Sequence, residues 1–439
     1  MVIRMDRNSE GKEYSEFSDV QAGVRTHGML NWAERELSSE YIDTAPKRPG
    51  VDKPFLTLTL AILMIGVIMI LSASFARAYY TSGEPLRLFM RQLVFAISGV
   101  ALMLLTSRLS VRTMSRWSTH LLIVSIAMLV LVLVVGIRLN GAKRWIGIGE
   151  GNSSFTFQPS EIAKVAIILA YAQMICKFGK ARMKTFRFGV VPFVAITAIM
   201  VVLLLREPHL SAAIIITVLA AILMFAGGTR LRWFLLAGLA ITAVIGIVVF
   251  TGFLAPGHND ENQAANETGA QTAWGDRLGY AGKRIDAWLD PEAAPLHEGF
   301  QIRQSLYAVG SGGLLGQGLG QSRQKYLYLP EEHNDYIFAI VCEELGFIGA
   351  MLILMLFVLL IIRGFWLALH AKDRYSSLIT TGITSLLAIQ VFLNVAVVTN
   401  LVPATGISLP FFSYGGTALW IQLVQMGIIL AVSREIPAK

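Results

Sequence analysis

The chain has 439 residues, of which 54% are hydrophobic and only 15% are charged, and its mean hydropathy is +0.59. A soluble protein of this length carries far more charge, so the composition excludes a soluble enzyme and indicates a polytopic membrane protein. The net charge of +8 comes from basic residues in short loops, which is typical of membrane topology and not of nucleic-acid binding. Cys176 and Cys342 have no spaced partners, so we expect neither a disulfide nor a cysteine metal site.

Residues 1–53 carry mixed charge and few large apolar side chains. We expect a mostly disordered cytoplasmic tail, followed by a first apolar run that acts as an uncleaved anchor. Apolar runs long enough to cross about 30 Å of hydrocarbon follow at 54–77, 88–106, 118–137, 159–176, 190–206, 210–227, 233–253, 337–362, 376–400 and 411–432. The sequence therefore predicts an all-α polytopic membrane protein of about ten helices, seven in 54–253 and three in 337–432, with a short tail at 433–439.

Basic residues in the short loops predict the orientation, because loops rich in Lys and Arg stay in the cytoplasm. Segment 177–187 carries five basic residues and no acidic one. Both termini are predicted to be cytoplasmic, and the loops 138–158, 254–336 and 401–410 to face outward. The loop 254–336 is far longer than ordinary connections, so we expect it to be functional, with short helices in the plane of the membrane interface.

The stretch 330–349 places carboxylates beside and inside an apolar run. Asp335 lies at the mouth of the run, and Glu343 and Glu344 lie within it. A carboxylate in hydrocarbon costs roughly 2.5–3.5 kcal/mol on insertion scales, so such residues usually face a protein-lined cavity. Asp335 is close to both water and lipid, which suits a general base. A capping or ion-pairing aspartate is the alternative.

Two groups of residues near the outer face could contact an anionic substrate. Lys143, Arg144 and Trp145 in loop 138–158 could hold a phosphate and a sugar, or could anchor the loop at the lipid interface. Glu161 and Lys164 are three residues apart on one helix, and we favour a buried structural ion pair over a catalytic role.

The long loop contributes further basic and amide side chains that we expect to contact substrate. These residues are Lys283, Arg284, Gln301, Arg303, Gln304, Arg323 and Lys325. The glycine-rich run 310–320 would let backbone N–H groups approach a pyrophosphate, although a flexible hinge explains it equally well. Ser413, Gly415 and Gly416 at the start of the last span are small enough for close helix packing.

The combination and order of these motifs resemble the SEDS family of bacterial membrane proteins, which includes FtsW, RodA and SpoVE. The matching stretches are Lys143-Arg-Trp-Ile, Gln158-Pro-Ser-Glu, Gln301 with Gln304-Ser305, the run 310–320, residues 329–338, Glu343-Glu-Leu-Gly and residues 409–416. The resemblance covers about residues 54–435, and Asn334 with the Ser322-Arg-Gln-Lys-Tyr stretch looks more like FtsW or SpoVE than RodA. One stretch departs from the pattern, because Arg206-Glu-Pro-His-Leu-Ser stands where Gln-Pro-Asp-Leu-Gly is more usual.

The resemblance implies a GT-C-like peptidoglycan glycosyltransferase that polymerises lipid II on the outer face of the cytoplasmic membrane. It implies that Asp335 is catalytic, and that the partners are a class B penicillin-binding transpeptidase and other divisome or elongasome membrane proteins. The expected mechanism is an inverting displacement, with Asp335 as base and Lys and Arg groups stabilising the departing pyrophosphate, with or without Mg²⁺ or Mn²⁺.

Two other classes compete with the enzyme. The first is a lipid II flippase whose polar path is lined by Glu161, Lys164, Glu343 and Glu344. The second is a noncatalytic division scaffold, which would leave the carboxylate at the outer rim unexplained. The sequence does not distinguish division, elongation and sporulation.

Overall fold

The computed structural model describes residues 50–139, 142–148, 155–236, 238, 284, 287–292 and 298–436. The predicted tail 1–53 lies outside these residues except for its last four, and most of the predicted span 233–253 lies outside them too. Residues Gly50–Arg434 form one compact unit. The architecture below is that of this unit.

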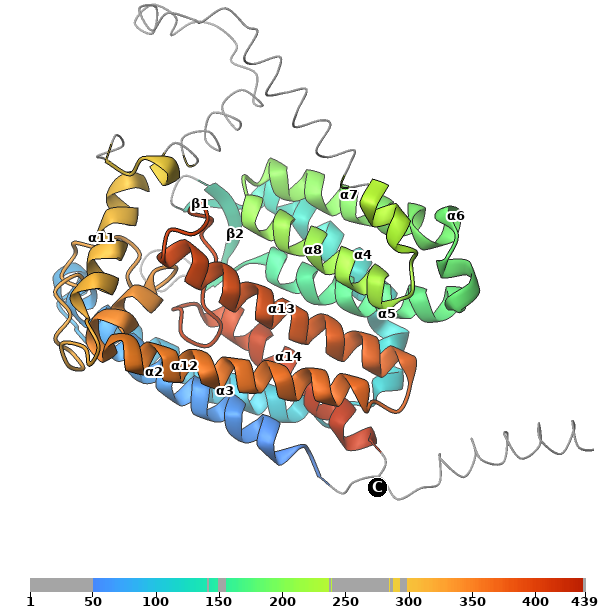
Figure 1. Cartoon of the computed structure of the whole chain (residues 1–439), viewed down its shortest axis with the longest axis horizontal. Helices are drawn as coiled ribbons and strands as arrows, with labels where there is room; N and C mark the ends of the chain where they lie inside the picture. The colour runs from blue at the N-terminus through green and yellow to red at the C-terminus, as the bar shows by residue number, and fades with distance from the viewer. Residues whose placement is uncertain are drawn as a thin grey trace, which may run out of the picture. The chain divides into compact units, whose positions relative to one another are not determined.

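Helices, most of them long and running roughly side by side, form the unit Gly50–Arg434 (Figure 1). They are α2 (Lys53–Ser82), α3 (Arg87–Thr106), α4 (Val111–Val135), α5 (Pro159–Met183), α6 (Phe186–Gly189), α7 (Val191–Arg206), α8 (Leu210–Ala226), α11 (Glu298–Ser311), α12 (Ile337–Leu369), α13 (Arg374–Val398) and α14 (Gly416–Glu435). Eight helical stretches among the described residues are long and apolar enough to cross a membrane, and α8 is a shorter apolar helix. The prediction of an all-α polytopic membrane protein is confirmed.

Local sequence explains where several helices begin and end. Asp52 caps α2 by accepting a hydrogen bond from the Phe55 N–H at 2.9 Å, and α2 ends at Gly83, whose φ of 71° suits glycine. Pro159 opens α5, as the Gln158-Pro-Ser-Glu stretch predicts. The last span begins at Gly416 and not at 411, because Phe411 has a φ of 66° and 411–415 form a turn.

A small antiparallel sheet, which the sequence analysis did not predict, fills part of loop 138–158. Its strands β1 (Ile137–Leu139), β2 (Ala142–Ile148) and β3 (Phe155–Phe157) pair in the order β1-β2-β3. Trp145 is opposite Ile137, and Ile146 is opposite Phe157. We call the end of the bundle formed by this sheet, turn 330–336 and segment 399–415 the sheet end.

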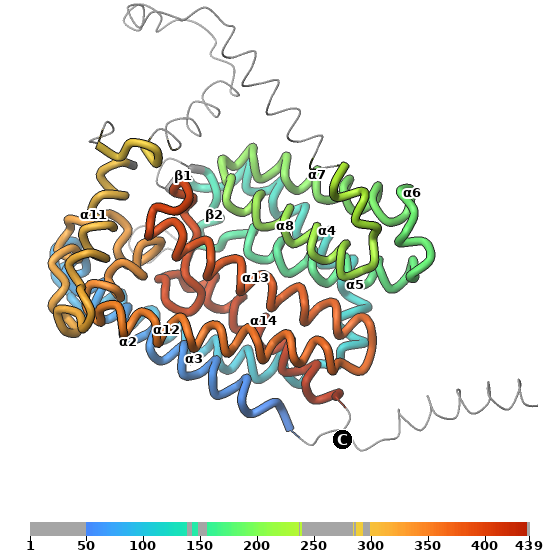
Figure 2. Tube along the Cα trace, viewed as in Figure 1, coloured from blue at the N-terminus to red at the C-terminus, as the bar shows by residue number. Residues whose placement is uncertain are grey.

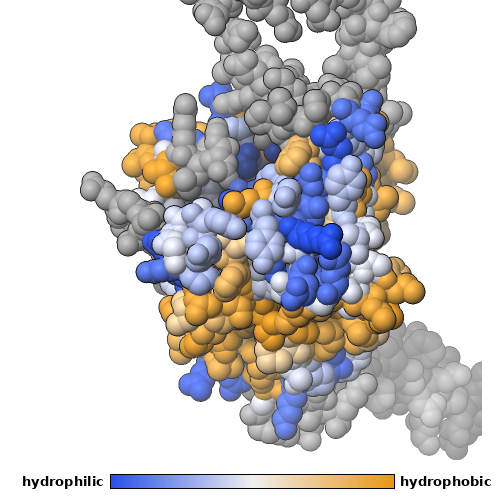
Figure 3. Space-filling view, turned by 90° about the vertical axis from the view of Figure 1, so that its left-hand side faces the viewer, coloured by the Kyte–Doolittle hydropathy of each residue, from blue (hydrophilic) through white to orange (hydrophobic). Residues whose placement is uncertain are grey.

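The helices differ in how much apolar surface they bury. The apolar parts of α5, α13 and α14 are mostly buried, whereas those of α3 and α4 are mostly exposed, as expected for helices that face lipid. The tube in Figure 2 follows α13 through the middle of the bundle, and Figure 3 shows hydrophilic residues beside a broad hydrophobic band on the left-hand face.

Candidate active site

A cavity of about 920 Å³ lies at the sheet end and contains Asp335. Residues from α2, α3, the sheet, α5, the α7–α8 connection, turn 330–336, α13 and segment 404–418 line it. Its charged lining residues are Arg77, Arg91, Arg144, Glu161, Lys164, Arg284, Glu331 and Asp335. Five cations face three carboxylates, so the cavity is suited to a large anionic ligand.

The backbone around Asp335 is fixed by a side chain from α13. The Asn394 amide donates from Nδ2 to the Asp335 carbonyl and to the Ile407 carbonyl, both at 2.7 Å. Gly406 lies close by with a φ of 65°, and a Cβ there would come within 3.2 Å of Asp335 Oδ2. Asn394 thus joins turn 330–336 to segment 399–415, and Gly406 leaves room for the carboxylate.

The turn that carries Asp335 is anchored on two further sides. Arg77 of α2 makes a bidentate ion pair with Glu332, with both N–O distances at 2.7 Å. Ser413 Oγ donates to the Asn334 carbonyl, and the Tyr414 N–H donates to the His333 carbonyl, each at 2.8 Å. Burial alone would raise the pKa of Glu332, but the neighbouring His333 and Arg77 hold it below its ordinary value. An ion pair and hydrogen bonds to backbone carbonyls therefore fix the position of turn 330–336.

Burial, with the adjacent negative charge of Glu331, raises the pKa of Asp335 to about 6. The positive charges of Arg144, Arg284 and His333 act in the opposite direction. Asp335 is consequently ionised at neutral pH but is more basic than an ordinary aspartate. These are the properties required of a general base.

Three cations reach the cavity from separate segments. Arg144 of β2 donates from Nη2 to the Pro208 carbonyl, and Arg284 donates from Nη1 to the Ala404 carbonyl at 2.9 Å. Lys164 bonds Glu161 at 2.7 Å, so the ion pair that their spacing predicts is present. Backbone carbonyls therefore help to orient two guanidinium groups.

The structure brings together only part of the residue set predicted from sequence. The predicted residues that line the cavity are Asp335, Arg144, Trp145, Arg284, Gln301, Glu161, Lys164, Gly415 and Gly416. Lys143 is absent from this lining, since its Nζ donates to the Leu133 and Val134 carbonyls at 2.9 Å and caps α4. Arg303 and Gln304 on α11 are also absent from it. Lys283 lies outside the described residues.

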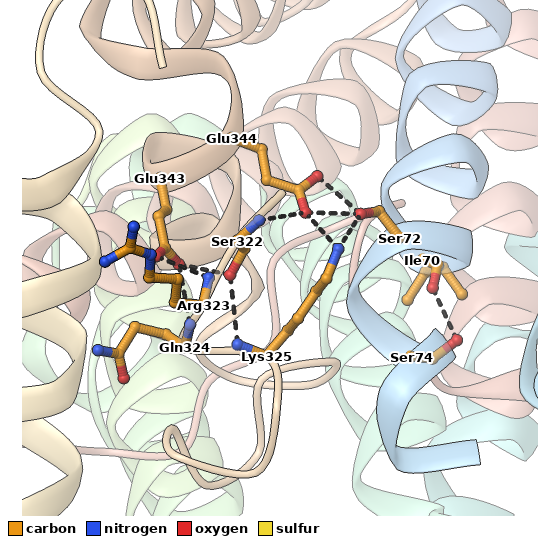
Figure 4. Close-up of polar contacts among 9 residues, drawn as sticks. All are labelled: Ile70, Ser72, Ser74, Ser322, Arg323, Gln324, Lys325, Glu343 and Glu344. Carbon is orange, nitrogen blue, oxygen red and sulfur yellow. Dashed lines mark hydrogen bonds and ion pairs between the residues drawn. The ribbon is translucent and has the colours of Figure 1, made fainter. Parts of the chain in front are cut away.

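Four predicted residues meet one another elsewhere. Figure 4 shows Glu343 and Glu344 turned toward segment 322–325, which contains Arg323 and Lys325. Lys325 Nζ bonds Glu344 at 2.9 Å, and the Arg323 N–H donates to Glu343 at 3.0 Å. The two glutamates predicted to line a cavity are thus buried in protein contacts. We therefore leave Lys325 and Lys143, whose ammonium groups have protein partners, out of the set proposed to contact substrate.

The sequence analysis missed several residues that line the cavity. These are Arg77, Arg91, Glu331, His209 and Gln390. Arg77 and Arg91 lie near the ends of apolar runs, where interfacial basic residues are common and carry no functional signal. The departure from the family pattern at residues 206–211 was the one available indication for His209.

The connection between α7 and α8 contains a carboxyl group in an unusual environment. Glu207 is fully buried, and neither carboxyl oxygen has a hydrogen-bond partner within the described part of the chain. Burial raises the pKa of Glu207 to about 8, against the opposing charge of Arg144. Burial, with the positive charges of Arg144 and Lys164, lowers the pKa of His209 well below its ordinary value. Both side chains are therefore neutral at pH 7.

We expect Glu207→Gln to raise thermal stability at alkaline pH. The pKa of Glu207 in the folded protein lies above its unfolded value. Its contribution to the free energy of unfolding is therefore fully present below about pH 4.5 and is lost as the pH rises toward 8. The glutamine variant removes this titration. Its melting temperature should match that of the parent at pH 5 and exceed it by about 2 °C or more at pH 8.5. Identical pH dependence in both proteins would mean that Glu207 is ionised in the folded state.

No cluster of three or more His, Cys, Asp or Glu side chains suited to a metal ion occurs among the described residues. Asp335 and Glu331 would leave most of the coordination sphere of a Mg²⁺ or Mn²⁺ ion to substrate phosphate and water. We therefore derive no step through a metal ion.

Comparisons with known proteins agree on the family. The family model for FtsW, RodA and SpoVE, described as "Cell cycle protein", matches residues 53–437. The chain is 41% identical over 392 residues to Stage V sporulation protein E of Bacillus subtilis, covering 88% of this chain and 98% of that protein. It is 38% identical over 385 residues to the probable peptidoglycan glycosyltransferase FtsW of Trichlorobacter lovleyi, covering 87% and 93%.

Solved structures show the same fold. A chain from a structure titled "Structural coordination of polymerization and crosslinking by a peptidoglycan synthase complex" superposes with a TM-score of 0.69 at 26% identity, covering 89% of this chain and all of that one. The Thermus thermophilus rod shape determining protein RodA superposes with a TM-score of 0.60 at 26% identity, covering 90% and 100%. The chain therefore belongs to the FtsW, RodA and SpoVE family of polytopic membrane proteins, the SEDS family.

Proposed function

We propose that this protein is a peptidoglycan glycosyltransferase that polymerises lipid II into glycan strands. The observation that carries the proposal is a partly buried carboxylate, Asp335, in a cation-rich cavity at one end of a membrane bundle. Lipid II is a sugar joined through pyrophosphate to a lipid, so its polymerisation needs a base, cations and access from the bilayer. The name of the FtsW relative supports the same activity.

The proposed reaction is a single displacement that inverts the donor sugar. Asp335 takes the proton from the acceptor C4 hydroxyl as that oxygen bonds to C1 of the donor. The bond from C1 to the pyrophosphate oxygen breaks, and the electron pair leaves with the lipid pyrophosphate. Arg144, Arg284 and Lys164 would stabilise the charge on this leaving group, and their fixed positions limit the reorganisation that the reaction requires.

A lipid II flippase is less well supported by the arrangement of the charged residues. The path considered for it requires Glu161, Lys164, Glu343 and Glu344 to line one polar route. Glu161 and Lys164 line the cavity, whereas Glu343 and Glu344 are bonded to residues 322–325. The charged groups gather at the sheet end, unlike the central sites typical of transporters.

Polymerisation of purified lipid II in detergent or nanodiscs tests the proposed function. The protein, alone or with its transpeptidase partner, should convert lipid II into glycan strands that a muramidase degrades. Translocation of lipid II across a vesicle without any glycan product, under conditions where a known polymerase is active, would support the flippase instead.

Neighbouring basic residues in β2 offer a matched test of the cavity. Arg144→Ala removes a cation that lines the cavity, so we expect polymerisation to fall by about 10²-fold or more, as for other groups that stabilise developing charge. Lys143→Ala removes an adjacent cation that caps α4, so we expect near-normal turnover per folded molecule. Rates measured at saturating lipid II distinguish the two. Equal losses in both variants would contradict the assignment of Arg144.

The finer localisation is also a proposal. We infer that the protein spans the bacterial cytoplasmic membrane with both termini in the cytoplasm, residues 1–53 and 433–439 as cytoplasmic tails, and loop 254–336 outside. The five basic residues in 177–187 support this orientation. A reporter fused after Lys180 should remain cytoplasmic, and one inserted after Ala265 should be exported. Reporters on the same side would overturn it.

The proposed partner is a class B penicillin-binding transpeptidase. Its support is the structural neighbour whose title describes coordinated polymerization and crosslinking in a peptidoglycan synthase complex. Other divisome or elongasome membrane proteins remain part of the proposal through family membership. Co-purification with the transpeptidase, and its effect on the polymerisation rate, test this assignment.

A further inference from the structure

Segment 312–329 packs against α12 through its backbone, at the point where α12 departs from helical geometry. Gly346 has a φ of 68°, and a Cβ there would lie 2.2 Å from Gly316 N. A Cβ at Gly312 would lie 2.0 Å from the Cys342 carbonyl oxygen, and one at Gly316 would lie 2.2 Å from the Glu344 carbonyl oxygen. Gly312 and Gly316 of the run 310–320 are thus required for contact between two backbones, whereas a Cβ at Gly310, Gly313 or Gly320 would meet no atom within 4 Å.

The opened turn of α12 exchanges its hydrogen bonds with this segment. In a continuous helix the Glu343 and Glu344 carbonyls would accept from Phe347 and Ile348. The observed bonds are Phe347 N to Gly313 O (2.9 Å), Ile348 N to Leu314 O (3.1 Å), Gln317 N to Glu343 O (3.0 Å) and Gly318 N to Glu344 O (3.0 Å). All four polar groups of the opened turn therefore find partners without water. Irregular backbone at membrane depth requires such internal pairing.

The segment also supplies partners to the two carboxylates of α12: Glu344 pairs with a cation, and Glu343 accepts hydrogen bonds only. Glu344 accepts hydrogen bonds from Lys325 Nζ at 2.9 Å and from Ser72 Oγ of α2 at 2.7 Å (Figure 4). Glu343 accepts from the Ser322 hydroxyl and from the Arg323 N–H. Lys325 and both glutamates are 2% exposed or less. Both carboxylates are thus buried, and their hydrogen-bond donors come from segment 322–325 and from α2.

The outer surface of the same segment is largely apolar, and Gln317, Gln321 and Arg323 are the polar side chains exposed on it. Its exposed large side chains are Leu314, Leu315, Leu319, Tyr326, Leu327 and Tyr328, with Leu315 80% exposed. The sequence has no charged residue between Gln304 and Ser322. Exposed Phe347 and Ile348 of α12 adjoin Leu314 through the backbone bonds above, and the exposed flank continues along the helix through Met351 and Met355.

We propose that residues 312–329 form a re-entrant membrane segment whose leucine and tyrosine side chains contact lipid. Three independent features support lipid as the occupant: the continuity with the exposed apolar flank of α12, the internal pairing of the opened backbone, and the burial and full hydrogen bonding of the two carboxylates. The segment leads directly into turn 330–336, which carries Asp335. It therefore places the proposed general base next to the bilayer. The inference concerns membrane insertion and stands whether or not the proposed function is correct.

Site-directed spin labelling measures the depth of this segment directly. A nitroxide on Leu315→Cys, in a Cys176→Ser and Cys342→Ala background, is compared with labels on Met355→Cys and Glu292→Cys. The protein is placed in nanodiscs of phosphatidylcholine and phosphatidylglycerol. The label at 315 should resemble that at 355, accessible to oxygen and shielded from a water-soluble nickel complex, whereas 292 should show the reverse. Access of the nickel complex at 315, or shielding from both reagents by a covering protein surface, would overturn the proposal.

A second measurement uses the ion pair that neutralises Glu344. Lys325→Met leaves a buried carboxylate without its cation, so the label at 315 should become at least several-fold more accessible to the nickel complex. Lys325→Met combined with Glu344→Gln removes both charges and should restore the parental accessibility. Unchanged accessibility in the single variant would show that the pair does not hold the segment in the membrane.

Discussion

Asp335→Asn should lower lipid II polymerisation by about 10²–10⁴-fold, the range that general-base catalysis contributes. The substitution keeps the size of the side chain and removes its proton acceptor. The Asn394 bond to residue 335 uses the backbone carbonyl, so it survives the change. The variant should therefore insert, fold and melt at the parental temperature.

The pH profile adds a readout that a structural aspartate would not affect. The reaction needs the ionised form, so activity should fall as pH falls through about 6, the pKa of Asp335. Glu331→Gln is the matched control, because it removes the neighbouring negative charge that raises this pKa. Its acidic limb should move to lower pH while activity at pH 7.5 stays within about tenfold of normal. Normal polymerisation by folded Asp335→Asn protein would exclude the catalytic assignment.

Arg77→Ala should destabilise the protein and also impair its specific activity. The change leaves Glu332 buried without its cation, and breaking a buried ion pair costs about 3 kcal/mol or more. Because Glu332 is fixed in turn 330–336, the loss should also displace Asp335. Thermal unfolding and polymerisation per folded molecule measure the two effects separately.

A second bidentate ion pair provides the control for this variant. Arg363 bonds Asp52 at 2.6 and 3.0 Å, and both arginine side chains are a little over one quarter exposed. Arg363→Ala should lower the melting temperature similarly but leave the activity of the folded fraction near normal. Equal specific activity in both variants would show that the pair of Arg77 and Glu332 does not position the site.

The helices were largely predictable because hydrocarbon thickness imposes a minimum length on each apolar run. The sheet was not, since β2 has only seven residues and lies between two spans, where hydropathy indicates only a loop. The ion pair of Glu161 and Lys164 follows from helical spacing. The pair of Lys325 and Glu344 does not, because the opened turn at Gly346 that brings them together depends on backbone contacts distant in sequence.

The residues of the candidate site also differ in how far the sequence predicts them. Asp335 and Arg144 stand in stretches whose composition is unusual for a membrane protein, so sequence reasoning found them. Arg77 and Glu207 have no such context. Their roles depend on what surrounds them in three dimensions. Arg77 anchors turn 330–336 through Glu332, and the carboxyl group of Glu207 is fully buried. The glycine run shows the limit most clearly, because its composition fits a phosphate site, whereas the close contact of two backbones at Gly312 and Gly316 is visible only in the structure.

The way Asp335 is held also determines what can be transplanted between relatives. Its turn is secured by Arg77 from the first described helix, by Asn394 from the penultimate one, and by Ser413 just before the last. A chimera that exchanged only the short acidic stretch would inherit the aspartate without its three supports. Functional grafts in this family should therefore move α2, α13 and segment 399–415 together, as a single inherited module.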